Sequence, residues 1–351
     1  MITDQQPLLS IVIVAYKSAT DLQRCLPSLY TAELAQITHE VLIIDNYGED
    51  QLETWLAATY PASKYFLNPL NTGYSGGNNI GIDLARGHWT LLLNPDTELL
   101  PGSLAQLLET AKANPDALIN PKLLNPDGTI NACGNQMHYT GITTCRGLNE
   151  PSGNYQKLER ISLLSGAAVL SPTAVLRTLL GFDEQYFMYF EDTDLSLRAR
   201  LLGYPLLCES RSVIIHHYRL GMNSTKFGYL ERNRLLTLLK VLSGHTLRQL
   251  LPALLITEFL TWVYALRGRS YLRSRFWGYT WLWQNRQEIR EKRRQIQQTR
   301  LIPDAELIGD SLSALPFDQV VSSPIGKFIN WLTYQVYRLL RPYFLRPSSY
   351  V

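Results

Sequence analysis

The sequence contains little cysteine and no long uncharged apolar run. Its four cysteines, Cys25, Cys133, Cys145 and Cys208, are widely scattered and form no C-x-x-C pair. That spacing argues against a zinc ribbon and against a disulfide framework, and it suits a reducing cytosol. The first nine residues have no basic patch followed by an apolar core, so we expect no secretory signal there.

The most apolar stretch is 250–266, and it is interrupted by Pro252 and Glu258. A membrane-spanning helix needs roughly 20 consecutive, nearly uncharged residues. We therefore expect an interfacial or buried helix here rather than a transmembrane one. Internal repeats and low-complexity segments are also absent from the sequence.

Two common nucleotide-binding motifs are missing as well. The glycine-rich stretch 71–79 reads Asn-Thr-Gly-Tyr-Ser-Gly-Gly-Asn-Asn, which fits neither G-x-G-x-x-G nor G-x-x-x-x-G-K-[ST]. It precedes and opens an expected helix, where glycines let a ligand approach the backbone and the helix N-terminus favours negative charge. A plain helix-start loop without a ligand explains the same residues.

What is present indicates a globular α/β protein with an extension. The chain has 351 residues, of which 46% are hydrophobic and 18% charged, so it can bury a sizeable core. Apolar strands alternate with helices in the first third, which predicts a parallel sheet covered on both faces. The expected strands are 9–15, 40–45, 64–68 and 88–93, and the expected helices include 20–29, 50–59, 76–86 and 103–114.

The alternation weakens after residue 120. Residues 129–160 are rich in Gly, Asn, Thr and Ser and show little periodicity, so we expect a substrate-facing loop region. Regularity returns at 161–170, a helix is expected over 191–202, and 206–209 and 212–216 look like strands.

From about residue 229 the chain is helical, basic and rich in tryptophan. Residues 267–300 contain ten Lys or Arg against two Glu, although the net charge of the whole chain is only +3. Four of the seven tryptophans lie within 262–283. Aromatic rings beside arginines suit the headgroup layer of a membrane. A helical subdomain with a solvated charged face is the alternative, and it applies equally to the amphipathic stretch 328–344.

Polar residues follow two of the expected strands. Asn94-Pro95-Asp96 ends the strand 88–93, and the carboxyl ends of strands hold ligands and metal ions in open α/β sheets. A carboxylate such as Asp96 is a hard oxygen ligand for a divalent cation that holds a diphosphate. Asp45 could accept hydrogen bonds from a base or ribose. A simple turn accounts for either position.

Two later clusters also carry reactive groups. Glu191, Asp192 and Asp194 begin a helix, where they can cap it or where a carboxylate can accept a proton from an attacking hydroxyl. His216 and His217 end a late strand, and an imidazole can complete a cation site. Neighbouring strand residues point to opposite faces, so at most one histidine can serve.

Taken together, these segments resemble glycosyltransferase family 2, and within it the bacterial rhamnosyltransferase-like members. No single segment is decisive, but the ordered set is specific and spans residues 9–220. The extension from 229 onward also resembles that of such enzymes. The matching segments are 10–18, 41–46, 71–81, 93–99, 165–167, 182–203 and 213–217.

The resemblance implies a GT-A fold, with a Rossmann-like, mostly parallel central sheet flanked by helices. This domain is expected over 1–228, with a nucleotide-sugar half of about 1–120 and an acceptor half of about 121–228. The helical extension is 229–351. The implied reaction is the inverting, metal-dependent transfer of a sugar from a nucleotide-diphosphate donor, with Mg²⁺ or Mn²⁺ as cofactor.

The implied acceptor is a hydroxyl of a growing polysaccharide or lipid-linked glycan. With the scattered cysteines and the basic extension, this leads us to expect a cytoplasmic protein in peripheral contact with the inner face of the plasma membrane. No nucleic acid partner is expected.

The family's motifs also imply roles for residues on the donor side. Ala15 and Tyr16 line the nucleotide pocket and Asp45 contacts the base. Gly73 and Asn78 lie near the donor. Each of these assignments depends on the position of the residue in a matching segment.

The same comparison implies a metal site and a base. Asn94 and Asp96 form the D-x-D-like motif, in which Asp96 binds the metal and His216 is the late metal ligand. Asn94 departs from the usual Asp, so the cation is held by less charge. Asp192 is the catalytic base, and the acceptor side includes Gly166 and Glu191.

Two rival functions use a similar fold. A sugar nucleotidyltransferase would need a glycine-rich basic loop directly after the first strand, and residues 15–18 lack glycine. An inactive glycan- or nucleotide-binding scaffold predicts decay of the acidic motif, whereas Glu191, Asp192 and Asp194 are all present.

Overall fold

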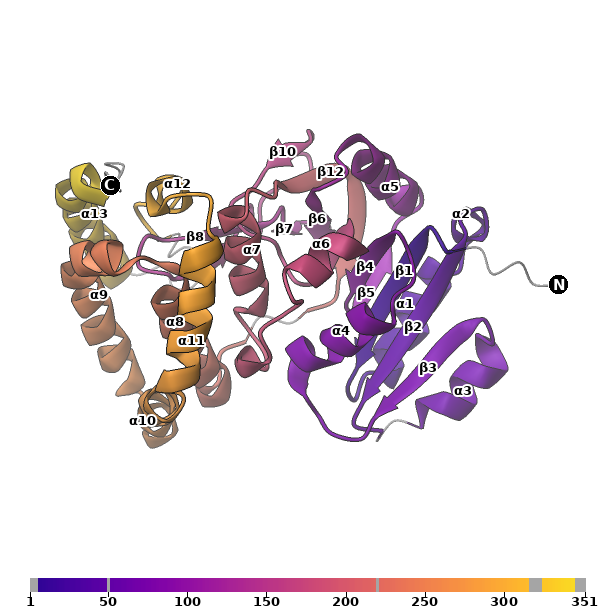
Figure 1. Ribbon diagram of the computed structural model, residues 1–351, viewed down its shortest axis with the longest axis horizontal. Coiled ribbons are helices and arrows are strands. Elements are labelled where there is room, and N and C mark those ends of the chain that lie inside the picture. The colour runs from indigo at the N-terminus through magenta and orange to yellow at the C-terminus, as the bar shows by residue number, and fades with distance from the viewer. Residues whose placement is uncertain (1–5, 49–50, 219–220, 316–323, 345–351) are drawn as a thin grey trace. The chain divides into compact units, whose positions relative to one another are not determined.

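The computed structural model describes residues 6–48, 51–218, 221–315 and 324–344 (Figure 1). The chain divides into two compact units that alternate along the sequence. Unit 1 consists of Met1–Gly134, Cys145–Leu195 and Tyr204–Arg219. Unit 2 consists of Asn135–Thr144, Ser196–Gly203 and Leu220–Val351. The domain boundary expected at residue 229 stays a prediction.

Unit 1 is built on a ten-stranded sheet. The strands are β1 (Leu9–Ala15), β2 (His39–Asn46), β3 (Ser63–Asn68), β4 (Trp89–Leu93), β5 (Thr97–Leu99), β6 (Leu118–Leu124), β7 (Ile130–Ala132), β10 (Glu159–Arg160), β11 (Ala168–Pro172) and β12 (Leu206–His216). Their main order is β10-β12-β6-β11-β4-β1-β2-β3, while β5 pairs with β12 and β7 with β6.

The first four strands pair in parallel, as the alternation of strands and helices predicts. Strands β1, β2 and β4 are continuous apolar runs because both of their faces are buried. Strand β11 runs antiparallel to β4 and β6, and it ties the later strands to the parallel set. The predicted α/β class is confirmed.

Eight helical segments accompany this sheet. They are α1 (Ala19–Leu29), α2 (Ala32–Ala35), α3 (Leu52–Thr59), α4 (Gly73–Leu84), α5 (Ser103–Ala113), α6 (Thr173–Thr178), the 3₁₀ helix η1 (Glu184–Tyr186) and α7 (Glu191–Leu201), which continues into unit 2. The elements expected within 9–114 are found with small shifts at their ends. Strand β6 and helix α6 were not anticipated, and the two strands expected within 206–216 form the single strand β12.

Helix α4 lies unusually close to β1. A Cβ at Gly77 would be 2.5 Å from Val14 Cγ1, and one at Gly81 would be 2.1 Å from Val12 Cγ1. The opposite face of β1, with Ile11 and other alternate residues, packs into the core cluster that includes α1. The two glycines therefore set how near α4 comes to β1 of the sheet.

Residues 129–160 are less irregular than expected. They contain β7 and β10, and also β8 (Asn135–Met137) and β9 (Thr143–Cys145), which pair as a two-stranded sheet. Tyr139 is buried, and its hydroxyl donates to the carbonyl of Thr333 at 2.8 Å. This part of the stretch is a packed element of unit 2, so the expectation of an irregular loop is wrong for it, while its position relative to the substrate stays a prediction.

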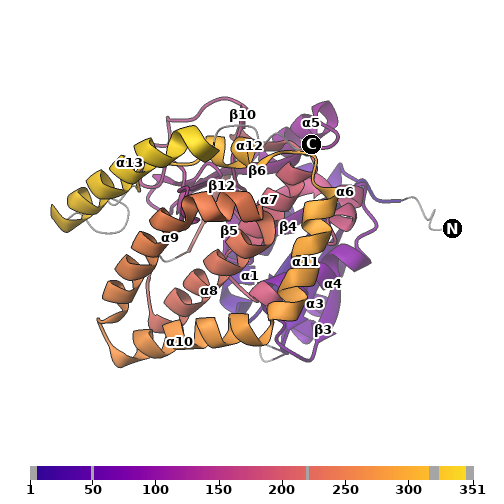
Figure 2. The same cartoon turned by 60° about the vertical axis from the view of Figure 1, so that its left-hand side comes forward.

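Unit 2 is mostly helical, as expected for the extension. Its helices are α8 (Ser224–Val241), α9 (Gly244–Ala265), α10 (Arg269–Gln284), α11 (Arg286–Thr299), α12 (Asp304–Gly309) and α13 (Pro324–Phe344). Figure 2 shows α8 between α9 and α11, with α10 running across one end of them. Among the described residues, no helix is both long and apolar enough to cross a membrane.

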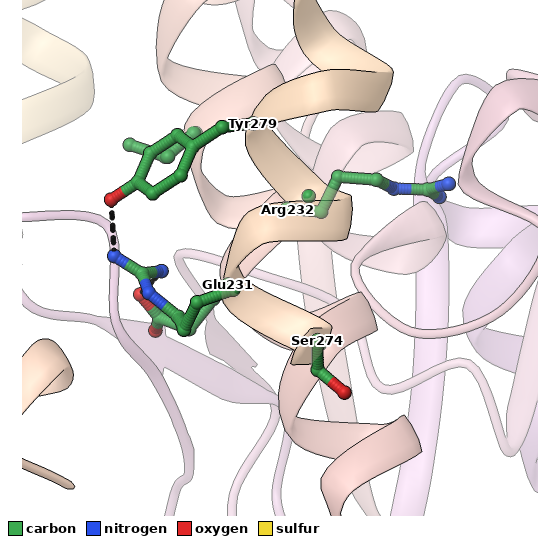
Figure 3. A pocket seen from close by; sticks show the side chains of 8 residues that line it. Glu231, Arg232, Ser274 and Tyr279 are labelled. Carbon is green, nitrogen blue, oxygen red and sulfur yellow. Dashed lines mark hydrogen bonds and ion pairs between the residues drawn. The ribbon is translucent and has the colours of Figure 1, made fainter. Parts of the chain in front are cut away.

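A buried ion network joins α8, α9 and α10. Glu231 Oε2 accepts from Arg234 at 2.8 Å and from Arg275 at 2.9 Å. Glu258 pairs with the same two arginines, each at 2.5 Å, so the single carboxylate within the apolar helix α9 is turned inward. Glu231 and Tyr279 also line a small hollow between α8 and α10, and Arg232 points away from both (Figure 3).

Candidate active site

Strand pairing brings Asn94-Pro95-Asp96, called the metal motif below, close to His216 and His217. Because β5 pairs antiparallel with β12, Thr97 lies opposite His216. The backbone N–H of His217 donates to the carbonyl of Asp96 at 2.8 Å. The side chains then meet, with His216 Nε2 3.4 Å from Asp96 Oδ1.

The imidazole of His216 has a second neighbour, Asn131. Its Nδ1 lies 3.2 Å from Asn131 Oδ1, and the Asn131 amide nitrogen donates to Asn125 Oδ1 at 2.8 Å. The amide oxygen can only accept, so His216 Nδ1 donates to it, and Nε2 is the ring nitrogen that faces Asp96. Asn131 is a supporting residue that the sequence analysis did not single out.

This pair fits a divalent cation. Asp96 Oδ1 and His216 Nε2 are both buried, and neither has a hydrogen-bond partner among the described residues. A carboxylate oxygen and a ring nitrogen that face each other without a hydrogen bond can both bind a positive ion when the imidazole is neutral. The described residues contain no group of three or more His, Cys, Asp or Glu able to hold a metal.

The two histidines have different surroundings. His217 Nε2 lies 3.2 Å from Glu98 Oε2, and its Nδ1 lies 3.2 Å from an Arg24 nitrogen. Burial acts to raise the pKa of Asp96, but the neighbouring imidazole of His216 outweighs this effect, and the pKa lies below its ordinary value. The geometry therefore pairs Asp96 with His216 and leaves His217 on the other side of the strand.

Asp192 is held at the start of α7 by backbone donors. Its Oδ2 accepts from the N–H of Gly166 at 3.0 Å, and its Oδ1 accepts from the N–H of Thr193 at 2.7 Å. A Cβ at position 166 would lie 3.3 Å from Asp192 Cβ, so glycine permits the close approach. Burial raises the pKa of Asp192 even though these hydrogen bonds lower it.

Glu191 is the more deeply perturbed member of the acidic pair. Burial, followed by the charge of Asp192, raises its pKa well above the ordinary value. Its Oε2 is buried without a hydrogen-bond partner among the described residues. Such a carboxyl holds its proton more readily than Asp192 does.

A strained turn of aromatic residues leads directly into Glu191 and Asp192. Phe187, Tyr189 and Phe190 have φ angles of 63°, 64° and 70°, a region that side chains rarely occupy. The carbonyl of Phe187 accepts from the N–H of Ser75 at 3.3 Å, and a Cβ at Gly73 would lie 2.2 Å from that oxygen. Gly73 thus allows the turn to pack on the start of α4, a contact that no local sequence pattern predicts.

Tyr74 connects the two halves of the site. Its hydroxyl donates to the carbonyl of Gly166 at 2.5 Å. Burial, and then the charges of Glu191, Asp192 and Asp96, raise its pKa well above the ordinary value. The negative charges of Asp96 and of the acidic pair therefore both act on the Tyr74 hydroxyl. Tyr74 lies inside the glycine-rich stretch, but its aromatic side chain was given no role from the sequence.

The residues expected to bind the nucleotide lie at the ends of β1 and β2. Ala15 lies opposite Asp45 in the parallel register. Asp45 accepts from the N–H of Gly48 at 3.0 Å and from the Tyr65 hydroxyl at 2.8 Å. Tyr16 is 45% exposed, and its ring centroid lies 6.3 Å from that of Tyr47, which is 47% exposed. The second tyrosine was not anticipated.

Two asparagines in this region have internal partners. The amide nitrogen of Asn78 donates to the carbonyl of Tyr74 at 2.9 Å within α4. Asn46, to which no role was assigned, donates to Gly73 O at 2.9 Å and accepts from Asn68 at 2.7 Å. It fixes the loop that leads into α4.

Asn94 holds the metal motif through its backbone. Its N–H donates to the carbonyl of Ala167 at 2.9 Å, and its carbonyl accepts from the Thr97 hydroxyl at 2.6 Å. The structure thus brings together Asn94, Asp96 and His216 on one side, and Gly166, Glu191 and Asp192 next to Tyr74.

Comparison with known proteins identifies the family. Residues 10–178 match the family described as "Glycosyl transferase family 2". A relative named N-acetylglucosaminyl-diphospho-decaprenol L-rhamnosyltransferase, from Mycobacterium tuberculosis, is 28% identical over 235 residues, which cover 60% of this chain and 76% of the relative.

Solved structures share the fold. Residues 1–349 of S. aureus TarS in complex with UDP-GlcNAc give a TM-score of 0.55 at 15% identity, with 95% of this chain and 90% of that chain covered. GalNAc-T7 with UDP, GalNAc and Mn²⁺ gives 0.56 at 17%, with 66% of this chain and 48% of that chain covered, so this chain spans about half of its length. The fold is that of the GT-A glycosyltransferases, and residues 10–178 of the chain belong to glycosyl transferase family 2.

Proposed function

We propose that this glycosyltransferase is an inverting, metal-dependent enzyme that moves a sugar from a nucleotide-diphosphate donor to a hydroxyl of a lipid-linked glycan. The observation that carries the proposal is the pair of buried, facing acceptor atoms of Asp96 and His216. Asp192 accepts from the N–H of Gly166, and the carbonyl of Gly166 accepts from the Tyr74 hydroxyl, which supports one site around Tyr74.

The donor would bind with its base near Tyr16 and Asp45 at the ends of β1 and β2. The exposed ring of Tyr16 and the carboxylate of Asp45 offer a stacking surface and a hydrogen-bond acceptor. The solved TarS and GalNAc-T7 structures contain UDP-GlcNAc and UDP respectively, which supports a nucleotide diphosphate as the ligand of this fold.

Asp96 and His216 would hold Mg²⁺ or Mn²⁺, and the neutral oxygen of Asn94 adds no charge to that site. When bound, the cation would offset the negative charge that grows on the leaving diphosphate. The Mn²⁺ in the GalNAc-T7 structure supports a divalent metal.

Asp192 would act as the general base. It accepts the proton of the acceptor hydroxyl while that oxygen bonds to the anomeric carbon and the bond from this carbon to the diphosphate breaks. Attack from the opposite face inverts the configuration. The raised pKa of Asp192 favours this proton transfer, and the two backbone N–H donors keep the carboxylate oriented. Gly166 and Glu191 would form the acceptor side.

The acceptor is proposed from the proposed transfer reaction and from the similarity of the chain to a named relative. The name of the M. tuberculosis relative describes transfer of L-rhamnose to N-acetylglucosaminyl-diphospho-decaprenol. We extend this to a rhamnosyltransferase-like reaction at the inner face of the plasma membrane, on the cytoplasmic side.

The test is a donor screen with the purified chain, in which release of nucleotide diphosphate is measured with and without Mn²⁺. A lipid diphosphate sugar serves as acceptor, and NMR of the product gives the anomeric configuration. We expect metal-dependent release and inversion. An inactive scaffold would bind a donor without releasing nucleotide diphosphate, and a nucleotidyltransferase would instead release pyrophosphate from a nucleoside triphosphate. Either result would overturn the proposal.

A further inference from the structure

Helix α9 carries a stripe of large apolar side chains on its surface. Leu251, Leu255, Phe259, Val263 and Leu266 are 50%, 59%, 67%, 48% and 70% exposed. Their spacing of three and four residues puts them on one face of the helix. Isolated exposed apolar residues are ordinary, but a row of five along one helix indicates an interaction surface.

The opposite face of α9 is already used for packing. Leu250, Ala253, Thr257 and Ala265 are buried, and Glu258 pairs with Arg234 and Arg275. The helix is therefore anchored through that face. The exposed stripe is not the face that holds α9 in place.

Helix α10 extends the surface. Phe276 is 61% exposed, and its ring centroid lies 5.1 Å from that of Trp262 on α9. Seven residues further along the same face, Trp283 is 67% exposed, with the guanidinium of Arg286 4.4 Å from its ring. Figure 2 shows the two helices meeting at one end of unit 2.

The charge of this surface has one sign. Between residues 244 and 287, Glu258 is the only acidic residue, and its carboxylate lies in the internal ion network. Arginines are exposed along both helices and at the turn between them. They are Arg248, Arg267, Arg269, Arg273 and Arg286.

We propose that the exposed face of α9 and α10 docks on an anionic lipid bilayer, with both helices lying in the plane of the interface. Apolar side chains enter the headgroup layer, and the arginines bind lipid phosphates. A second copy of the chain fits less well, because it would bring two sets of arginines together. The bilayer would also carry the lipid-linked acceptor of the proposed function, although docking itself does not require that reaction.

The experiment is flotation of the full chain with vesicles of phosphatidylcholine, alone or mixed with phosphatidylglycerol. We expect binding to the mixed vesicles and much weaker binding to phosphatidylcholine alone. Replacing Leu255 and Phe259 by Ser should weaken binding by about tenfold for each side chain. The matched control is Leu180→Ser, at a site that is 82% exposed in unit 1, and it should bind like the wild type.

The charge component is tested with Arg269→Gln and Arg273→Gln, each of which should weaken binding to the mixed vesicles by about fivefold. The loss should vanish at high salt, where the wild type is also weakened. Arg290→Gln, an exposed site on α11, is the control and should change little. Equal binding of the wild type to both vesicle types would overturn the choice of an anionic surface.

Two further measurements separate the outcomes. Light scattering of the free protein should give a monomer. A dimer that the Leu255 and Phe259 changes dissociate, with vesicle binding unaltered, would assign the face to a second copy and overturn the proposal. Release of nucleotide diphosphate by donor hydrolysis should be unchanged in all of these variants. Docking without any release would count against the proposed function alone, and release without docking would overturn only the membrane proposal.

Discussion

The two units bury charged side chains in different ways. In unit 2, Glu231 and Glu258 each accept from both Arg234 and Arg275. In unit 1, Asp96, Glu191 and His216 each keep a buried polar atom without a hydrogen-bond partner among the described residues. Paired buried charges join helices, whereas buried acceptors that face each other unpaired indicate a place for a ligand.

The largest expected effect concerns catalysis in unit 1. Asp192→Asn keeps the size of the side chain but cannot accept the acceptor's proton. We expect the turnover number for transfer to fall by about 10²–10⁴-fold, while donor affinity stays near that of the wild type. Steady-state rates and donor titration measure the two quantities. Asp116→Asn, at an exposed site, is the control, and undiminished transfer by Asp192→Asn would remove the assigned base.

The next effect concerns stability in unit 2. Glu231→Gln removes the charge that pairs with two buried arginines, so we expect the free energy of unfolding to fall by about 3–5 kcal/mol in denaturant titration. Glu288→Gln is the matched control because its side chain is 50% exposed and its pair with Lys292 is worth less than about 1 kcal/mol. Equal losses in the free energy of unfolding from Glu231→Gln and Glu288→Gln would contradict the view that the buried ion network stabilises unit 2.

The two adjacent histidines give a sharper test. His216→Ala removes the group that faces Asp96, whereas His217→Ala removes one that faces Glu98. We expect the first to weaken the Mn²⁺ dependence of donor binding by about 10–100-fold and the second to change it far less. Calorimetric titration of the donor at several Mn²⁺ concentrations measures this. A larger effect at His217 would reverse the assignment.

The smallest expected effect is at Glu191. Its substitution should raise the free energy of unfolding, whereas substitution of Glu231 should lower it. Because the folded-state pKa of Glu191 is raised, the folded chain binds its proton more tightly, and stability from this group decreases as pH rises above the ordinary range of a glutamic acid. Glu191→Gln removes that penalty. We expect a higher free energy of unfolding than the wild type at neutral pH, and a difference that shrinks as the pH is lowered. A lower free energy of unfolding for Glu191→Gln than for the wild type at neutral pH would contradict this, because it would show that other groups stabilise the Glu191 carboxylate in the folded chain.

Parts of this arrangement were predictable from local sequence. Continuous apolar runs gave β1, β2 and β4, and the polar residues after them gave Asp45 and Asp96. The pairing of Asp96 with His216 was expected only from family resemblance, because it depends on the register between β5 and β12, which no local pattern encodes.

Other features depend on tertiary packing. The left-handed turn at Phe187, Tyr189 and Phe190 contains no glycine, so no local pattern predicts it. Glu258 read as an interruption of an apolar segment, but it is an internal partner of Arg234 and Arg275. The catalytic and binding roles assigned from the resemblance remain predictions.

The most direct test is a crystal structure of the chain with Mn²⁺ and a nucleotide diphosphate, with data collected for the anomalous signal of manganese. The account predicts an anomalous peak at about 2.0–2.3 Å from both Asp96 Oδ1 and His216 Nε2. An active enzyme whose manganese lies elsewhere, away from both side chains, would contradict it.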